Sequence, residues 1–197
     1  MLVAVAAAAP ALLLTPTVGS ARGRPGPVTL RNRHLVVQAV ESKPAANKLA
    51  NTGDTTGATK CTGEEHAAMT SIGGDFASKY GEITGRGFTS LAERLRLGPD
   101  DVFVDCGSGL GLSVSQAARE FGVRRSYGVE FSTSRHDLAV ERLAADASDD
   151  DTASRVRLLQ GDCAEAALWA AEGELSTCTC VYACNLLFDA ALNARIK

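Results

Sequence analysis

The residues with the clearest capacity for chemistry form one glycine-rich segment, Asp105-Cys106-Gly107-Ser108-Gly109-Leu110-Gly111. It follows a short apolar run and opens a stretch with helical spacing, which is the context that a nucleotide-binding loop requires. Gly107, Gly109 and Gly111 would allow a sharp turn and the close approach of a ligand to the backbone. The G-x-G-x-G spacing differs from the G-x-G-x-x-G of dinucleotide enzymes. Because such a loop can also be a purely structural turn, other residues must support the interpretation.

Three polar residues stand where a ligand on this loop would need them. Glu130, Asp162 and Asn185 each end or follow an apolar run that predicts a strand. A carboxylate at Glu130 can accept hydrogen bonds from both hydroxyls of a ribose, and Asp162 can accept one from an adenine amino group. Open parallel sheets bind ligands at the carboxyl ends of their strands. Each acid alone is compatible with a solvated loop, but together they indicate a nucleoside site.

The elements that must position these residues alternate along the chain. Short β-branched and aromatic runs predict buried strands, and the segments between them predict helices. This alternation is typical of βαβ units with right-handed crossovers and a parallel sheet, hence an α/β fold. The predicted strands are residues 101–105, 126–130, 155–160 and 177–184, the predicted helices are residues 64–79, 89–97, 110–121, 134–146, 164–171 and 189–197, and an acidic loop is expected at 148–152.

The loop and the acids together resemble the class I S-adenosylmethionine-dependent methyltransferases. The resemblance implies a Rossmann-like sheet and S-adenosyl-L-methionine as the cofactor. It implies that Asp105 orients the methionine end and that the loop glycines and Ser108 admit the cofactor. It further implies that Glu130 holds the ribose while Asp162 and Cys163 border the adenine. The absence of a diphosphate in this cofactor agrees with the glycine spacing.

A narrower resemblance rests on Tyr80-Gly81-Glu82 upstream of the loop and on Ala183-Cys184-Asn185-Leu186-Leu187-Phe188 near the end. Residues 78–197 resemble the disruptor-of-telomeric-silencing family, the non-SET histone lysine methyltransferases that act on H3 lysine-79 in the nucleosome. The resemblance implies that residues 80–84, including Ile83 and Thr84, form a lid over the cofactor. It implies that Tyr80 and Asn185 are catalytic, with Asn185 beside the methyl group.

The chain departs from this family's pattern at several positions. Cys184 replaces the first Asn of the family pair, Leu186 replaces its Phe, and Ile83 stands where the family usually has Thr. The chain also ends within the last predicted helix, so we expect a sheet truncated after its fourth strand. The aromatic residues of the family's lysine channel would lie in the absent strands.

The chain divides into three expected regions. Residues 1–45 are expected to be a leader or disordered segment, because residues 2–14 are apolar and four arginines precede the first acid, Glu41. Residues 46–90 are expected to be a linker with a helical lid or cap, and residues 91–197 the cofactor-binding core. The family resemblance implies a nuclear protein, whereas a true leader would indicate an organelle or the secretory pathway.

Charge and composition exclude several classes of protein. The net charge is −3, and residues 61–197 alone carry −8, so binding of nucleic acid by bulk charge is not expected. No run reaches the length of apolar residues that a membrane-spanning helix needs. The three histidines are scattered, and Cys178, Cys180 and Cys184 alternate on an apolar run. This pattern favours buried thiols over a zinc site, so no metal is expected.

The sequence therefore predicts an S-adenosylmethionine-dependent protein-lysine methyltransferase, with histone H3 in nucleosomes as the partner that the resemblance implies. One alternative is a methyltransferase for a non-histone protein or a small molecule in an organelle. Another is a truncated, non-catalytic remnant that only binds the cofactor. An NAD-dependent oxidoreductase is disfavoured by the glycine spacing.

Overall fold

The computed structural model describes residues 2–4, 35–37, 61–146, 150–171, 173–185 and 187–196. Most of the expected leader and residues 46–60 of the expected linker lie outside these residues. The parts of the leader that are described are two three-residue strands, β1 (Leu2–Ala4) and β2 (Leu35–Val37), which pair in parallel. Within the described part of the chain, no helix has the length and apolar character needed to cross a membrane.

The main sheet has four parallel strands in the order β5-β4-β3-β6. The central strand β3 pairs with β4 on one side and with β6 on the other, and all five of its residues are buried. A fully buried, β-branched strand is what a parallel sheet covered on both faces requires. The strands are β3 (Val102–Cys106), β4 (Arg125–Glu130), β5 (Val156–Gln160) and β6 (Cys180–Tyr182).

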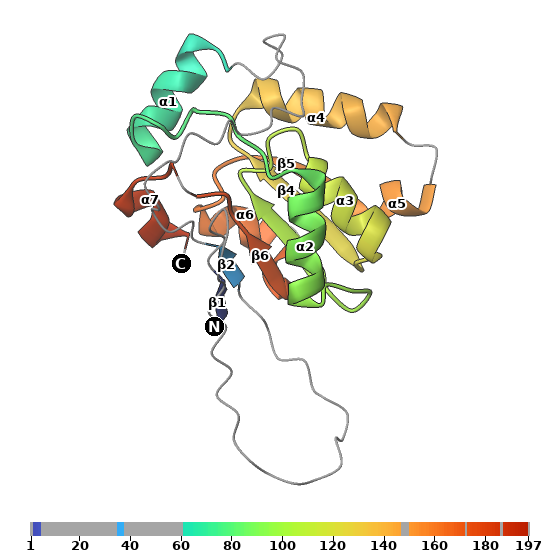
Figure 1. Ribbon diagram of the computed structural model, residues 1–197. Coiled ribbons are helices and arrows are strands. Elements are labelled where there is room, and N and C mark those ends of the chain that lie inside the picture. The colour runs from blue at the N-terminus through green and yellow to red at the C-terminus, as the bar shows by residue number, and fades with distance from the viewer. Residues whose placement is uncertain are drawn as a thin grey trace, which may run out of the picture.

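Helices cover both faces of this sheet (Figure 1). Phe88 lies at the centre of one face, where its ring meets Phe103 edge-to-face at a centroid distance of 5.5 Å. Trp169 packs against the opposite face, as part of a cluster that includes Val102, Val104 and Leu175. The helices are α2 (Gly85–Leu95), α3 (Leu112–Phe121) and α4 (Thr133–Ala145) on the Phe88 face, and α6 (Ala166–Ala171) on the other, beside the 3-10 turn Leu175–Thr177.

The acidic loop and the fourth strand differ from the expectations. The expected acidic loop contains a short helix, α5 (Asp150–Arg155), in which Asp151 and Arg155 form an ion pair at the i,i+4 spacing. Arg155 also donates to the carbonyl of Gly122, so the helix is held by a contact that is distant in sequence. The fourth strand, Cys180–Tyr182, is shorter than the expected 177–184, because the chain before it forms a 3-10 turn at Leu175–Thr177.

Two further helices lie together at one end of the molecule, beyond the carboxyl ends of the strands (Figure 1). They are α1 (Gly63–Gly73) and α7 (Ala190–Arg195), and the amide of Asp189 donates to the carbonyl of Gly73 at 2.9 Å. Helix α1 begins with a capping box between Thr62 and Glu65. It ends earlier than expected, at Gly74, whose φ of 87° favours glycine. This is the helical cap over the strand ends.

Candidate functional site

A cleft opens where strands β3, β4 and β5 end, beneath helices α1 and α7. Its cavity has a volume of about 100 Å³ and is open to solvent on one side. A smaller hollow adjoins it and shares Gly81, Glu82, Gly107 and Cys184 with its wall. The cleft lies at the carboxyl edge of a parallel sheet, which is where open α/β folds bind ligands.

The glycine loop forms the floor of the cleft and needs its glycines. Gly107, Gly109 and Gly111 have φ values of 87°, 54° and 72°, a region that L side chains rarely adopt. A Cβ atom on Gly109 would lie 2.9 Å from the ring of Tyr80. The amides of Gly107 and Ser108 both donate to the carbonyl of Val129, which holds the loop against β4. Gly111 serves as the N-cap of α3 and does not line the cleft.

Glu130 ends β4 inside this cleft with its hydrogen bonds already made. Its side chain is buried, Oε2 accepts from the amide of Gly109 at 2.8 Å, and Oε1 accepts from the amide of Ser132 at 3.0 Å. The guanidinium of Arg135 lies 4.0 Å from Oε1. Because each carboxylate oxygen can accept two hydrogen bonds, Glu130 retains capacity for a ligand.

Arg135 is a site residue that the sequence interpretation missed. It is only 4% exposed, donates from Nη2 to the carbonyl of Ser78 at 2.7 Å, and places its Cζ atom 5.1 Å from the centre of the Tyr80 ring. It therefore joins the lid to Glu130. The available signal was its position: a cation in the first turn of α4 opposes the helix dipole and so needs a partner elsewhere.

Asp105 ends β3 and differs from Glu130 in its hydrogen bonding. It is also buried, and the hydroxyl of Ser113 donates to its Oδ2, but Oδ1 has no hydrogen-bond partner among the described residues. Burial raises the pKa of Asp105 to about 7, and the negative charges of Glu130 and Glu82 add to the rise. Asp105 therefore borders the adjoining hollow with a buried, incompletely hydrogen-bonded carboxyl group.

The lid contributes two more polar atoms of this kind. Tyr80, Gly81 and Glu82 line the cleft, and the Tyr80 hydroxyl and Glu82 Oε1 are buried without a hydrogen-bond partner in the described structure. Burial and the nearby Glu82 carboxylate raise the pKa of Tyr80 above its ordinary value. Ile83 lines the adjoining hollow. Thr84 lies outside both linings and caps α2 by accepting from the amide of Gly87 at 3.1 Å.

The end of β5 also reaches the cleft. Asp162 and Cys163 both line it. Asp162 Oδ1 accepts from the amide of Ala164 at 2.8 Å, and Oδ2 accepts from Arg195 on α7 at 2.9 Å. Arg195 also donates to Glu165 at 3.0 Å. The loop after β5 is thus tied to α7, which closes that side of the cleft.

The end of β6 places a different residue in the cleft from the one expected. Asn185 is buried, donates from Nδ2 to Asn193 Oδ1 on α7, and is absent from both linings. Its neighbour Cys184 lines both the cleft and the adjoining hollow. The expectation of buried thiols on this strand is correct for Cys178 and Cys180 and wrong for Cys184, which is exposed.

Glu65 on α1 is a second residue that the sequence interpretation missed. Its Oε1 accepts from the amide of Ser134 at 2.8 Å and from the hydroxyl of Ser132 at 3.1 Å, and its Oε2 accepts from the hydroxyl of Ser134 at 2.8 Å. Desolvation works in the opposite direction, but these hydrogen bonds and one from the amide of Thr62 lower the pKa of Glu65 to about 2. Glu65 therefore docks α1 onto the start of α4.

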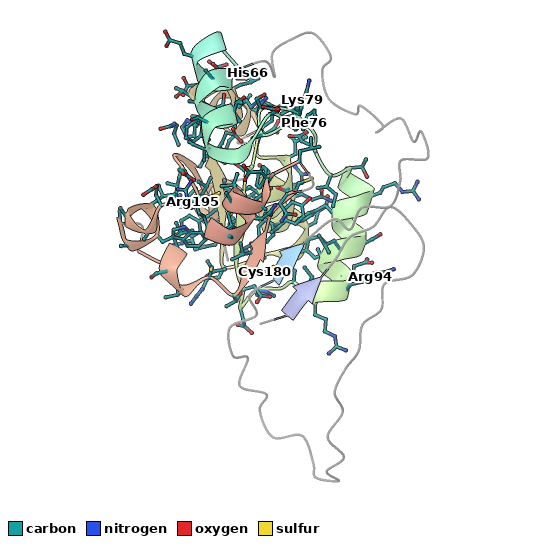
Figure 2. The ribbon with its side chains drawn as sticks, turned by 90° about the vertical axis from the view of Figure 1, so that its left-hand side faces the viewer. His66, Phe76, Lys79, Arg94, Cys180 and Arg195 are labelled. Atoms are coloured by element: carbon teal, nitrogen blue, oxygen red, sulfur yellow. The ribbon has the colours of Figure 1, made fainter. Side chains whose placement is uncertain are left out.

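The electrostatic character of the cleft is acidic. Glu82, Asp105, Glu130 and Asp162 contribute four carboxyl groups, whereas Arg135 and Lys79 are the cationic residues among its described lining. Figure 2 shows Lys79 beside Phe76 near α1, at the cleft end of the molecule. Among the described residues, no group of histidine, cysteine and acidic side chains has an arrangement that could hold a metal ion. The arrangement favours an organic ligand that carries positive charge.

A sheet of this order, with a glycine loop after the central strand β3 and acids at the ends of β4 and β5, defines a Rossmann-like protein of the class I methyltransferase type. Within that class the chain belongs to the family described as histone methylation protein DOT1, which it matches over residues 74–197. The match includes the lid, the glycine loop and the ends of strands β4, β5 and β6, and it confirms the family resemblance.

Individual relatives agree with this assignment. A "Histone-lysine N-methyltransferase, H3 lysine-79 specific" from Cryptococcus neoformans is 49% identical over 51 residues, which cover 26% of this chain and 8% of that protein. The protein of the same description from Kluyveromyces lactis is 38% identical over 60 residues, 30% of this chain and 10% of that one. The chain thus matches about a tenth or less of these relatives.

A solved structure of an RNA methyltransferase from Salinibacter ruber, in complex with S-adenosyl-L-homocysteine, is also similar. It is 27% identical, with a TM-score of 0.42, over 52% of this chain and 60% of that one.

Proposed function

We propose that this chain is an S-adenosylmethionine-dependent protein-lysine methyltransferase that acts on histone H3 at lysine-79. The family match and the relatives' descriptions support the reaction class and the substrate. The cleft supports the cofactor. In this proposal S-adenosyl-L-methionine supplies the methyl group, and the chain's residues bind it, orient it and exclude water from it.

One observation carries the cofactor assignment. Three buried polar atoms in one small region, the Tyr80 hydroxyl, Glu82 Oε1 and Asp105 Oδ1, have no hydrogen-bond partner in the described structure. Unpaired buried polar atoms are costly, so a native protein that keeps several together requires an explanation. S-adenosylmethionine carries an ammonium and a sulfonium, which suit an acidic pocket with free acceptors.

The remaining residues fit the other parts of the cofactor. Glu130 is held by two backbone amides and retains acceptor capacity for the two ribose hydroxyls. Asp162 and Cys163 border the space assigned to the adenine. The glycine floor leaves room for close approach, and Tyr80 lies directly over Gly109 as a lid residue would.

A substrate lysine must lose its proton before it can accept the methyl group. Burial lowers the pKa of an ammonium, because desolvation disfavours the charged form. Asn185 was expected beside the methyl group, and here its amide is held by Asn193 on α7. We therefore assign Asn185 the role of fixing the end of β6, with Cys184 facing the bound ligand.

Calorimetry with S-adenosyl-L-homocysteine tests the cofactor assignment. Gly107→Val should abolish binding, because the side chain would enter the floor of the cleft at a φ of 87°. Gly63→Ala is the matched control, since a Cβ at that position meets nothing within 4 Å. Binding that survives Gly107→Val in a folded protein would contradict the assignment.

Incubation with reconstituted nucleosomes and labelled S-adenosyl-L-methionine tests the substrate. We expect the label on H3 lysine-79 and the protein in the nucleus. Tight cofactor binding without methylation of nucleosomes or lysine peptides would instead favour a non-catalytic remnant. Methylation of another protein or a small molecule, together with location in an organelle, would favour the other alternative.

A further inference from the structure

Cys184 differs from every other cysteine in this chain. All six cysteines lie in the described residues, and Cys184 alone is exposed. Cys106, Cys178 and Cys180 are buried, while Cys61 and Cys163 are half-buried. Figure 2 places Cys180, in strand β6, far from the α1 end of the molecule where the cleft opens.

The surroundings of Cys184 supply an independent indication of a ligand. Cys184 lines both the cleft and the adjoining hollow, so it stands at their junction. Asp105, which is 4% exposed, lines the same hollow and keeps Oδ1 without a hydrogen-bond partner in the described structure. Glu82 lines both spaces and keeps Oε1 in the same condition. A positively charged group in this hollow would meet both carboxyl groups.

We propose that Cys184 is a covalent modification site that takes small, cationic thiol-reactive molecules in preference to anionic ones. With an alkyl methanethiosulfonate, the Cys184 thiol gives its proton to solvent and its sulfur attacks the sulfenyl sulfur of the reagent. A protein–reagent disulfide forms, the sulfur–sulfur bond of the reagent breaks, and methanesulfinate leaves with the electron pair. The reagent is therefore the oxidant.

The reaction at Cys184 is expected to be selective rather than fast. Desolvation in the cleft wall and the negative charge of Asp105 raise the pKa of the Cys184 thiol, which reduces the reactive thiolate at neutral pH. The same carboxyl groups attract cations and repel anions within the cleft. The charge of the reagent should therefore decide the rate.

Modification at this point would also block the cleft. The adduct would fill the junction of the two spaces, so it should compete with any ligand that occupies both. This consequence rests on the proposed cofactor binding. It is particular to this chain, because Cys184 stands where the family resemblance places an asparagine.

The test compares a trimethylammonium-ethyl and a sulfonato-ethyl methanethiosulfonate on the folded full chain at pH 8. Labelling of the Cys184 peptide is followed by mass spectrometry, and each rate is divided by the rate for the same peptide in the urea-unfolded chain. We expect this normalised rate to be about tenfold or more higher for the cationic reagent. A ratio near one, or no labelling of Cys184 in the folded chain, would overturn the proposal.

Variants locate the effect. Glu82→Gln should lower the cation preference several-fold, whereas Glu93→Gln on the exposed surface of α2 should leave it unchanged. Cys184→Ser should remove the label, and Cys163→Ser should retain it. Equal ratios in the Glu82→Gln and Glu93→Gln variants would contradict the role assigned to the cleft carboxylates.

Addition of S-adenosyl-L-homocysteine separates this inference from the proposed function. Slower labelling in its presence would support both. Cation-selective labelling that S-adenosyl-L-homocysteine does not slow would retain the modification site and count against the proposed cofactor.

Discussion

The ends of the neighbouring strands β3 and β4 each hold a buried carboxyl group, and the two groups differ in how completely they are hydrogen-bonded. Glu130 and Asp105 are each 4% exposed. Glu130 accepts hydrogen bonds from two backbone amides and lies near the guanidinium of Arg135, so the protein itself supplies its partners. Asp105 accepts one hydrogen bond, from the hydroxyl of Ser113, and its Oδ1 has no partner among the described residues. Its pKa is raised to about 7.

The difference shows how burial alone fails to define a role. A buried carboxylate with several donors is stable as an anion and contributes to folding. A buried carboxyl group without them destabilises the folded state when it ionises, so its persistence indicates a ligand. The fold therefore supplies the hydrogen-bond donors for the carboxylate at the end of β4, whereas the carboxyl group at the end of β3 lacks donors that a ligand could supply.

Glu130→Ala should have the largest effect, because it removes the anion on which the β4 end depends. It leaves Arg135 buried beside an absent partner and frees the amides of Gly109 and Ser132. Loss of one member of a buried ion pair costs about 3–5 kcal/mol. We expect a loss of about 3 kcal/mol in the free energy of unfolding, measured by urea titration, and no detectable cofactor binding by calorimetry.

Glu141→Ala on the exposed side of α4 is the control and should change stability by less than about 0.5 kcal/mol. Similar losses in the two variants would remove the distinction drawn for Glu130.

Asp105→Asn should raise the free energy of unfolding, in contrast to Glu130→Ala. Between the ordinary aspartate pKa of 3.8 and about 7, the folded protein keeps the Asp105 proton and the unfolded chain loses it. Stability that this group contributes therefore falls as pH rises through that interval, by up to about 1.4 kcal/mol per pH unit. Asn cannot ionise, so we expect the variant to match the wild type near pH 4 and to be more stable at pH 8.

The same substitution should weaken cofactor binding, because a cationic ligand favours the ionised form of Asp105. In the wild type, binding below pH 7 should release a proton, which calorimetry in two buffers of different ionisation enthalpy detects. A variant that loses stability at pH 8, or wild-type binding without proton release, would contradict the role of Asp105.

Glu65→Gln should have the smallest effect. Glu65 resembles Glu130 in its many donors but lies at the partly exposed rim, where solvent screens its interactions. Its pKa of about 2, against an ordinary 4.5, means that its contribution is complete above pH 4.5 and is lost as pH falls toward 2. We expect a loss of about 1 kcal/mol at pH 7 and faster amide hydrogen exchange in α1. Glu64→Gln, on the adjacent exposed position, should change neither.

Much of the fold could be predicted from the sequence because local patterns specify it. Buried strands such as Val102–Cys106 are β-branched runs bounded by turn residues, and Gly122 marks a helix end by its left-handed conformation. The acidic helix α5 could not be predicted in the same way. Its sequence is polar, and its stability depends on Arg155 reaching the carbonyl of Gly122, a contact that no local pattern shows.

The site residues also divide into those that local sequence predicts and those that depend on contacts between distant elements. The glycine loop and Glu130 follow from spacing along one βαβ unit, so sequence and structure agree on their positions. Arg135 and Glu65 act through side chains that cross between elements, and their partners are apparent only in three dimensions. Alternation along the last strand also misplaced Cys184, because regular pairing ends at Tyr182 and the strand parity no longer applies beyond it.

The position of β6 beside β3 has a consequence for the order of folding. β3 can pair with β4 once a short crossover has formed, but its other edge must wait for residues that lie 77 positions further along the chain, as in the bond from the amide of Val102 to Thr179. Closing so long a loop is slow and entropically unfavourable. During synthesis, the central strand therefore keeps one open edge until residues 179–182 have emerged, and protection of the β3 amides on that edge should appear only then.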